Sequence, residues 1–210
     1  MLFVALVVVI LLIIVPTVVV PTVLFPPARP KLDDRGRLPE FALTDHTGAT
    51  MTRASLEGRV TIVNFIFTRC DTVCPVTSMK MRTVQDKTND AGGDIKLVSI
   101  SVDPAHDTVD RLAAYADRYR ADPTRWRFAR GDIAAVRELV ERGMSIGFDD
   151  LGGTTPSGVP NITHSGHFVL IDQRGHIRGY YDSDDWPRIE TLMKHARYLV
   201  RRPPPPPAGS

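Results

Sequence analysis

The sequence predicts an α/β domain of three layers, preceded by an apolar segment and followed by a proline-rich tail. Two observations predict the fold: β-branched and aromatic runs typical of buried strands recur along the chain, and amphipathic stretches typical of helices separate them. Between residues 38 and 202 their order is strand, helix, strand, helix, strand, helix, hairpin, helix. The 210 residues fit one domain with appendages, because domains commonly have roughly 100–200 residues. A formal net charge of +2 argues against a dedicated nucleic-acid binder.

The first half of the predicted domain contains two units of strand and helix. The run "VTIVNFIF" (60–67) is apolar on both faces, which is typical of a buried central strand. Pro75 then stands where a helix begins, and the inner face of this helix is expected to carry Met79, Met81 and Val84. A second strand, "IKLVSISV" (95–102), leads to a helix near 108–120 with apolar residues at helical spacing. Asp107 and Thr108, in the turn before this helix, are interpreted as residues suited to capping it.

The sequence of the second half of the domain predicts a strand, two helices, a loop and a hairpin. The short strand "WRFA" (126–129) precedes a helix that Asp132 is able to cap. The stretch "FDDLGGTTPSGVPNITHSG" (148–166) has no periodicity, so we expect a long irregular loop, which in a compact domain is often functional. After it, "HFVLID" and "IRGYY" predict two strands joined by the turn "QRGH", and the last helix is expected at about 187–201.

Both ends of the chain differ in composition from the domain. Residues 1–28 have no charged side chain and exceed the roughly 20 apolar residues that a membrane-spanning helix needs. Their length and the lack of a small-residue cleavage site favour an uncleaved transmembrane anchor. Residues 29–37 are expected to be a linker, and the positive-inside rule applied to their Arg and Lys side chains would by itself keep that side of the membrane cytoplasmic. Residues 203–210 are rich in proline and predict a disordered tail.

The two cysteines of the chain, Cys70 and Cys74, are separated by three residues and followed directly by Pro75. A strand, then Cys-x-x-x-Cys-Pro, then a helix places both thiols near a helix N-terminus, where backbone N–H groups and the helix dipole favour thiolate. Because proline disfavours α geometry for the residue before it, Cys74 is expected in the turn that precedes the helix. Two such thiols are able to form a disulfide or to bind one metal ion, and the spacing alone leaves both open.

A metal ion bound by two thiolates needs a further ligand, and a histidine is the natural candidate. The six histidines are His46, His106, His164, His167, His176 and His195. His164 differs from the others because it ends the irregular stretch just before a strand, and ligands gather at strand ends in α/β sheets. Two soft sulfurs with one imidazole suit Cu(I), whereas structural zinc usually has four protein ligands.

Three segments of the chain resemble the Sco/SenC family of copper-binding proteins: "FIFTRCDTVCP", "SISVDPAHDTVDRLAAYADRYRADPTRWRF" and "THSGHFVLIDQRGHIRGYYD". The shared motifs are T-x-C-x-x-x-C-P, S-V-D-P-x-x-D-T and H-S before a strand. The resemblance implies a thioredoxin-like three-layer fold with a central mixed sheet over residues 38–202. It also implies copper as the bound ion, with Cys70, Cys74 and His164 as its ligands. Thr163 departs from the family, because many members have an acidic residue before the ligand histidine.

The resemblance implies a function as well: a membrane-anchored copper chaperone that helps to assemble the binuclear copper centre of cytochrome c oxidase. Its partners would be the copper-centre subunit of the oxidase and other copper chaperones, and its domain would lie on the periplasmic or intermembrane-space side. Two other classes stay open. One is a thiol–disulfide reductase with Cys70 and Cys74 as catalytic thiols, and the other is a copper or redox sensor. Oxidation of the two thiols to a disulfide would abolish the metal site, so copper loading depends on redox state.

Overall fold

The computed structural model describes Ile10 and residues 30–154, 160–164 and 166–203, with the backbone alone over 148–154 and 160–164. The chain divides into two compact units, Met1–Lys31 and Leu32–Ser210. The predicted transmembrane anchor (1–28) and all but the first residue of the predicted proline-rich tail lie outside the described residues, apart from Ile10. In the part of the chain that is described, no helix has the length and apolarity needed to cross a membrane.

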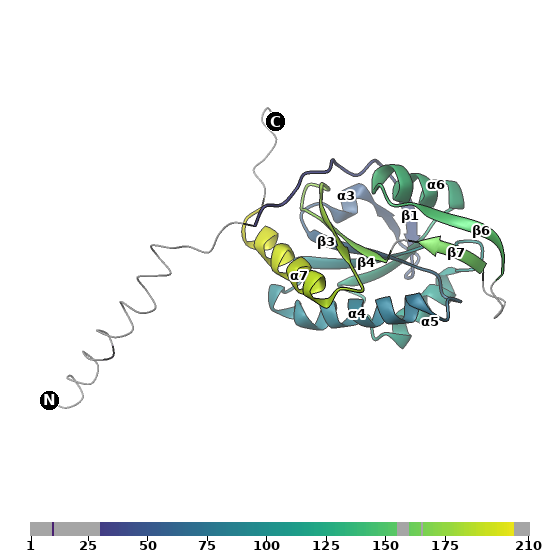
Figure 1. Cartoon of the computed structure of the whole chain (residues 1–210), viewed down its shortest axis with the longest axis horizontal. Coiled ribbons are helices and arrows are strands. Elements are labelled where there is room, and N and C mark those ends of the chain that lie inside the picture. The colour runs from purple at the N-terminus through teal and green to yellow at the C-terminus, as the bar shows by residue number, and fades with distance from the viewer. Residues whose placement is uncertain (1–9, 11–29, 155–159, 165, 204–210) are drawn as a thin grey trace. The chain divides into compact units, whose positions relative to one another are not determined.

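The described residues of the second unit form a mixed sheet of seven strands in the order β2-β1-β5-β4-β3-β8-β9 (Figure 1). The strands are β1 (Ala42–Asp45), β2 (Thr50–Thr52), β3 (Val60–Ile66), β4 (Ile95–Ser101), β5 (Trp126–Arg130), β8 (His167–Ile171) and β9 (Ile177–Asp182). The three central strands β3, β4 and β5 are parallel, and the outer pairs β3–β8, β8–β9, β1–β5 and β1–β2 are antiparallel. The predicted central mixed sheet is therefore confirmed.

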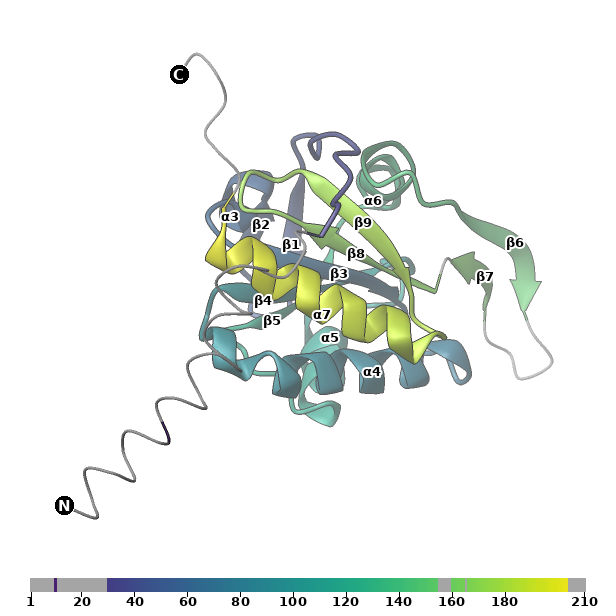
Figure 2. The ribbon, with the colours of Figure 1, turned by 60° about the vertical axis from the view of Figure 1, so that its left-hand side comes forward.

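Helices cover both faces of this sheet. They are α3 (Arg53–Leu56), α4 (Val73–Lys87), α5 (Val109–Arg118), α6 (Ile133–Arg137, continued as a π-helix over Glu138–Gly143) and α7 (Trp186–Arg201), with a short 3₁₀ turn at Asn89–Ala91. Helices α4, α5 and α7 lie on one face and α6 on the other (Figures 1 and 2). A buried hydrogen bond of 3.0 Å between Ser78 Oγ and Tyr115 OH joins α4 to α5. An ion pair of 3.0 Å between Arg197 and Asp90 joins α7 to the turn after α4.

The core forms where the sequence predicts buried strands. β3 is buried along its whole length, as its apolar pattern on both faces predicts. A chain of buried polar groups crosses the sheet, since Trp126 Nε1 donates to Ser99 Oγ (2.9 Å) and Ser99 Oγ donates to Asn64 Oδ1 (2.6 Å). The last helix, α7, packs one face on the core, and its buried residues are Ile189, Leu192, Met193, Ala196 and Leu199, with Val200 partly buried beside them.

The segment predicted as a long irregular loop is instead a pair of strands. β6 (Phe148–Thr154) pairs with β7 (Pro160–His164) in an antiparallel two-stranded sheet that extends past one end of the main sheet (Figure 2). The register shifts between Asp150 and Thr154, where the sequence contains Gly152 and Gly153. Glycine favours such bulges and has low strand propensity, so the composition of this segment did not predict strands. The two strands form because their backbone N–H and C=O groups hydrogen-bond to each other.

Two expectations about α4 are also wrong. Cys74 is the second residue of α4 and does not lie in the turn before it. Pro75 is tolerated there because the first-turn N–H groups have no intrahelical partners. Met79 is exposed, whereas Met81 and Val84 of the same helix are fully buried.

Residues 32–38, here called the N-terminal segment, pair with β9. Arg35 N–H donates to Ile177 O (3.0 Å) and Ile177 N–H donates to Gly36 O (2.9 Å), in the antiparallel sense. Leu38 N–H donates to the carbonyl of Gly175 in the β8–β9 turn (2.9 Å), and the Leu38 side chain is buried in the core. Most of this segment coincides with the predicted linker.

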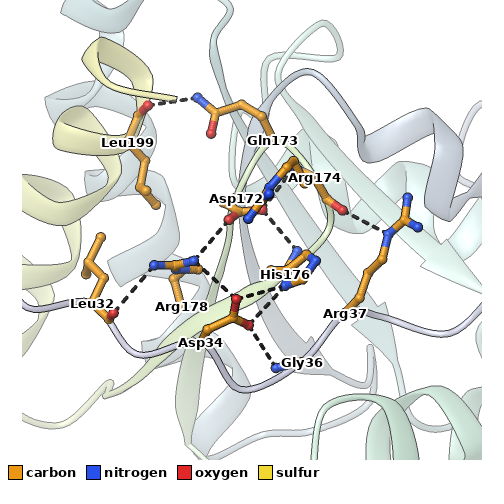
Figure 3. A network of polar contacts seen from close by, with 10 residues as sticks. All are labelled: Leu32, Asp34, Gly36, Arg37, Asp172, Gln173, Arg174, His176, Arg178 and Leu199. Carbon is orange, nitrogen blue, oxygen red and sulfur yellow. Dashed lines mark hydrogen bonds and ion pairs between the residues drawn. The ribbon is translucent and has the colours of Figure 1, made fainter. Parts of the chain in front are cut away.

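Side chains from the β8–β9 hairpin hold the N-terminal segment (Figure 3). Asp34 accepts a hydrogen bond from His176 Nδ1 at 2.9 Å and lies 3.7 Å from Arg178. Arg178 also pairs with the fully buried Asp172 at 3.4 Å and donates to Leu32 O. The hydrogen bond from His176 holds the pKa of Asp34 below its ordinary value, against the smaller opposing effect of burial.

Candidate metal and thiol-exchange centre

The two cysteines lie where the central strand β3 meets helix α4. β3 ends at Ile66, a turn follows in which Cys70 N–H donates to Phe67 O (3.2 Å), and α4 begins at Val73. Neither cysteine forms a disulfide. Cys70 is half-buried, whereas Cys74 is fully buried. Cys70 is therefore the thiol that a partner molecule reaches first.

The local hydrogen bonds distinguish the two thiols electrostatically. The backbone N–H of Cys74 donates to Cys70 Sγ at 3.4 Å, and Thr72 Oγ1 lies 3.8 Å from the same sulfur. A hydrogen bond from the Cys74 thiol is the main cause that lowers the pKa of Cys70 to about 5, and these backbone and Thr72 contacts add to it. Partial burial opposes the shift. The same thiol–thiol hydrogen bond and burial raise the pKa of Cys74 far above its ordinary value. At neutral pH the pair is one thiolate and one thiol.

A buried carboxylate, Asp107, holds the turn that carries Cys70. Asp107 accepts hydrogen bonds from Thr68 N–H (3.2 Å) and Thr68 Oγ1 (2.5 Å), and from Ser101 Oγ (2.5 Å). Thr68 follows β3 and Ser101 ends β4. Because β3 and β4 are parallel, with Ile66 opposite Ser101, both ends lie at one edge of the sheet. Burial raises the pKa of Asp107, and the hydrogen bonds to Ser101 and Thr68 oppose that shift.

Of the two residues predicted to cap α5, Thr108 does so by accepting from Arg111 N–H, whereas Asp107 bonds to Thr68 and Ser101 instead. The contact between Asp107 and Thr68 spans 39 residues, and it was not predicted from the sequence. The available signal was that Thr68 follows one buried strand and Asp107 lies in the loop after the next, and that a parallel sheet brings these two strand ends together. A second link across the same two loops is the ion pair of 2.7 Å between Arg69 and Asp103.

His164 is the last residue of β7, with Phe148 opposite it in the register. β8 begins three residues later at His167 and runs antiparallel to β3. The start of β8 therefore lies at the end of the sheet where β3 ends and the turn to Cys70 begins. Among the side chains that the structure describes, no three His, Cys, Asp or Glu form a metal-binding group. His164 is not among those side chains, so its role as a ligand stays a prediction.

Three other histidines have structural partners elsewhere in the domain. His46 Nδ1 accepts from Phe128 N–H at 3.1 Å. His176 pairs with Asp34, and His195 Nδ1 shares a hydrogen bond of 2.6 Å with Tyr181 OH. These contacts agree with the prediction that sets His46, His176 and His195 aside.

The family model described as SCO1/SenC matches residues 32–200. The chain belongs to the SCO1/SenC family. The match begins with the N-terminal segment and ends in α7, so it covers the whole sheet and the helices that pack on it.

Solved structures of SCO1/SenC proteins have the same fold. A SCO1/SenC family lipoprotein from Bacillus anthracis str. Ames matches with a TM-score of 0.73 and 25% identity over 82% of this chain and 99% of that chain. Bradyrhizobium japonicum ScoI with copper bound matches with a TM-score of 0.66 and 24% identity over 78% and 100%. BsSco, described as a member of the Sco family of cytochrome c oxidase assembly proteins, matches with a TM-score of 0.68 and 23% identity over 81% and 97%. The predicted thioredoxin-like α/β fold is thereby confirmed.

Proposed function

We propose that this SCO1/SenC protein is a copper chaperone that binds copper through Cys70, Cys74 and His164 and helps to assemble the binuclear copper centre of cytochrome c oxidase. The observation that carries the proposal is the pair of thiols, not joined in a disulfide, at the junction of β3 and α4 in a chain of this family. Copper is the cargo of such a protein. Support comes from the similar ScoI that has copper bound, and from BsSco, which belongs to a group of oxidase assembly proteins.

The chemistry of the donor set fits copper. Cu(I) prefers soft thiolate ligands and accepts imidazole, so two sulfurs and one histidine complete a three-coordinate site. Cys70 is a thiolate at neutral pH and needs no deprotonation to bind. Cys74 is protonated, so binding of the ion releases one proton from its thiol. Copper uptake should therefore strengthen as pH rises.

Transfer of the ion would proceed by ligand exchange with thiolates of the copper-centre subunit. The half-buried Cys70 would exchange first, since Cys74 lies beneath it in the first turn of α4. Residues 1–28 would anchor the protein in the membrane, with the domain on the periplasmic or intermembrane-space side. The lipoprotein nature of the similar Bacillus anthracis protein supports membrane attachment. Copper would reach the site from other copper chaperones.

A Cu(I) titration of the full chain in detergent, with the thiols reduced, tests the proposal. Wild type is expected to bind one equivalent tightly, and His164→Ala to lose that binding. His195→Ala is the matched control, because His195 bonds to Tyr181 and is expected to leave copper binding unchanged. Absence of tight binding in the wild type would refute the copper proposal.

A second candidate, a thiol–disulfide reductase, is favoured by the difference between the two thiols. The Cys70 thiolate would attack a partner disulfide, forming a mixed disulfide and releasing one partner thiolate. Cys74 would then lose its proton and attack Cys70 Sγ, releasing the second partner thiolate. The product is a Cys70–Cys74 disulfide, and two electrons have moved to the partner. If His164→Ala still supports oxidase assembly, this function replaces copper delivery.

A copper or redox sensor is the third class. Its deletion would change transcription or stress responses and leave oxidase activity normal. Loss of oxidase activity on deletion excludes it.

A further inference from the structure

The solvent side of α4 carries three large apolar side chains in its first two turns. Val73, Val76 and Met79 are 47%, 51% and 59% exposed, and together they are here called the α4 patch. Among the other described residues of the folded unit, the large apolar side chains exposed to a similar degree are Ile133 on α6 and Trp186 on α7. The α4 patch is thus a concentration of exposed apolar surface on one element.

Packing inside the domain does not account for the α4 patch. The opposite side of α4 supplies its core contacts through Cys74, Thr77, Ser78, Met81, Val84 and Gln85, all of which are buried. Beyond Met79 the solvent side of the helix changes to charged and polar residues, among them Arg82 and Asp86. Apolar exposure is therefore confined to the end of α4 that adjoins Cys70. Contiguous exposed apolar surface of this kind marks interaction sites.

The cations around the α4 patch are paired within the domain, and the exposed carboxylate of Asp71 lies two residues before Val73. Lys80 bonds to Asp184 at 3.0 Å, and Arg82 pairs with Asp86 at 3.0 Å. Arg69, in the turn before Cys70, is paired with Asp103. The rim consequently offers little unbalanced charge to attract an anionic membrane surface or a strongly charged protein. It suits a partner whose contacting surface is apolar.

The position of the α4 patch relative to Cys70 indicates which partner covers it. Val73 is the first residue of α4, and the next residue, Cys74, donates its backbone N–H to Cys70 Sγ. A thiol that exchanges with Cys70 must approach this sulfur to bonding distance. The polypeptide on either side of that thiol then lies over the first turns of α4.

We propose that the α4 patch is the docking surface for the protein that exchanges thiol ligands with Cys70. The inference rests on the proposed function, because it takes the exchanging partner to be the copper-centre subunit of the oxidase. Beyond the proposed function, the inference names the α4 patch as the contact surface. It also names the partner surface that fits the patch, which is an exposed cysteine-bearing loop flanked by apolar side chains. Binding by apolar contact should make transfer nearly independent of salt.

The test compares two variants of the full chain in detergent. In the patch variant, Val76→Gln with Met79→Gln, both changes lie on the solvent side and glutamine is a good helix former, so folding is preserved. Ile133→Gln is the matched control, since it removes an equally exposed apolar side chain from α6. Each protein is loaded with Cu(I), and the rate of transfer to the soluble domain of the oxidase copper-centre subunit is measured below saturation.

We expect the patch variant to bind Cu(I) as wild type does and to transfer it at least about 10-fold more slowly. The control should transfer at the wild-type rate, and the wild-type rate should change by less than about 3-fold between roughly 0.05 M and roughly 0.5 M salt. An unchanged rate in the patch variant, or an equal loss in the control, would overturn the docking proposal and leave the copper proposal intact.

A second measurement separates failure of the docking surface from failure of copper binding. Mixed-disulfide formation between Cys70 and the oxidised copper-centre domain requires no metal, and the patch variant should slow it to a similar degree. If wild type does not bind Cu(I) but the patch variant still slows disulfide exchange, the proposed copper function fails and the docking surface stands. Normal exchange by the patch variant would overturn the docking surface.

Discussion

The difference between the two thiols leads to a measurable pH profile of alkylation. The reduced, metal-free protein is treated with brief pulses of iodoacetamide between about pH 4 and about pH 9. The pKa of Cys70 is about 5, so its labelling rate should rise around that pH and then stay constant. Cys74 is fully buried and its pKa is raised, so it should remain unlabelled over the same range.

The size of the effect follows from the fraction of thiolate and its reactivity. At pH 5.5, a pKa of about 5 makes roughly three quarters of Cys70 thiolate. A thiol at the ordinary value of 9.0 has about 0.03% thiolate at that pH, which is a ratio of about 2,400. A thiolate of lower pKa is a weaker nucleophile, and the shift reduces its intrinsic rate roughly 40- to 100-fold. Cys70 should therefore react roughly 20- to 60-fold faster than an ordinary thiol near pH 5.5.

Mass spectrometry of each pulse identifies the labelled cysteine and its rate. Cys74→Ala tests the cause, because the hydrogen bond from the Cys74 thiol is the largest contribution to the lowered pKa of Cys70. This variant should move the midpoint of the profile to higher pH. A wild-type midpoint above about pH 8, or labelling of Cys74 before Cys70, would refute the reasoning.

Three further changes test the packing and charge of the domain. Asp107→Ala removes the buried carboxylate that ties two loops together and should lower the free energy of unfolding in urea by about 1.5–3 kcal/mol; a loss below about 1 kcal/mol would contradict that role. Met81→Ala empties a fully buried site and should cost about 2–5 kcal/mol. Met79→Ala, its exposed control in the same helix, should stay within about 0.5 kcal/mol. The pKa of Asp34 is lower in the folded state than its ordinary value of 3.8, mainly through His176. The stabilisation from Asp34 is thus present above that value and is lost as pH falls through the folded pKa. In Asp34→Asn, the free energy of unfolding should fall less steeply on acidification than in wild type, by less than about 1 kcal/mol in total. Equal pH dependence of unfolding in both proteins would argue against this pair.

Much of the domain could be predicted from sequence because burial leaves a direct pattern. β3 and β4 are apolar on both faces since helices cover both sides of the sheet, and the β8–β9 hairpin follows from two apolar runs around a Gly turn. The location of Cys70 between a strand and a helix also followed from sequence, whereas Cys74 lies inside the helix and not in the predicted turn.

Other features depend on contacts that no local pattern contains. The hydrogen bond from Thr68 to Asp107 joins residues far apart in the chain, and it forms because parallel strands end at a common edge. Met79 and Met81 are alike in sequence, and only the orientation of α4 decides which one enters the core. The strands β6 and β7 contain residues of low strand propensity and pair through their backbones.

The N-terminal segment also covers part of one edge of the sheet. β9 is the last strand of the seven-stranded order, and the segment bonds to its first residue, Ile177, through Arg35 N–H and Gly36 O. A chain shortened to begin after Leu38 would leave Ile177 with an unpaired N–H and carbonyl at an open edge, and would lose a buried core side chain. Open edges of this kind accept strands from other molecules. We therefore expect a chain that begins after Leu38 to associate through β9 more readily than the full chain.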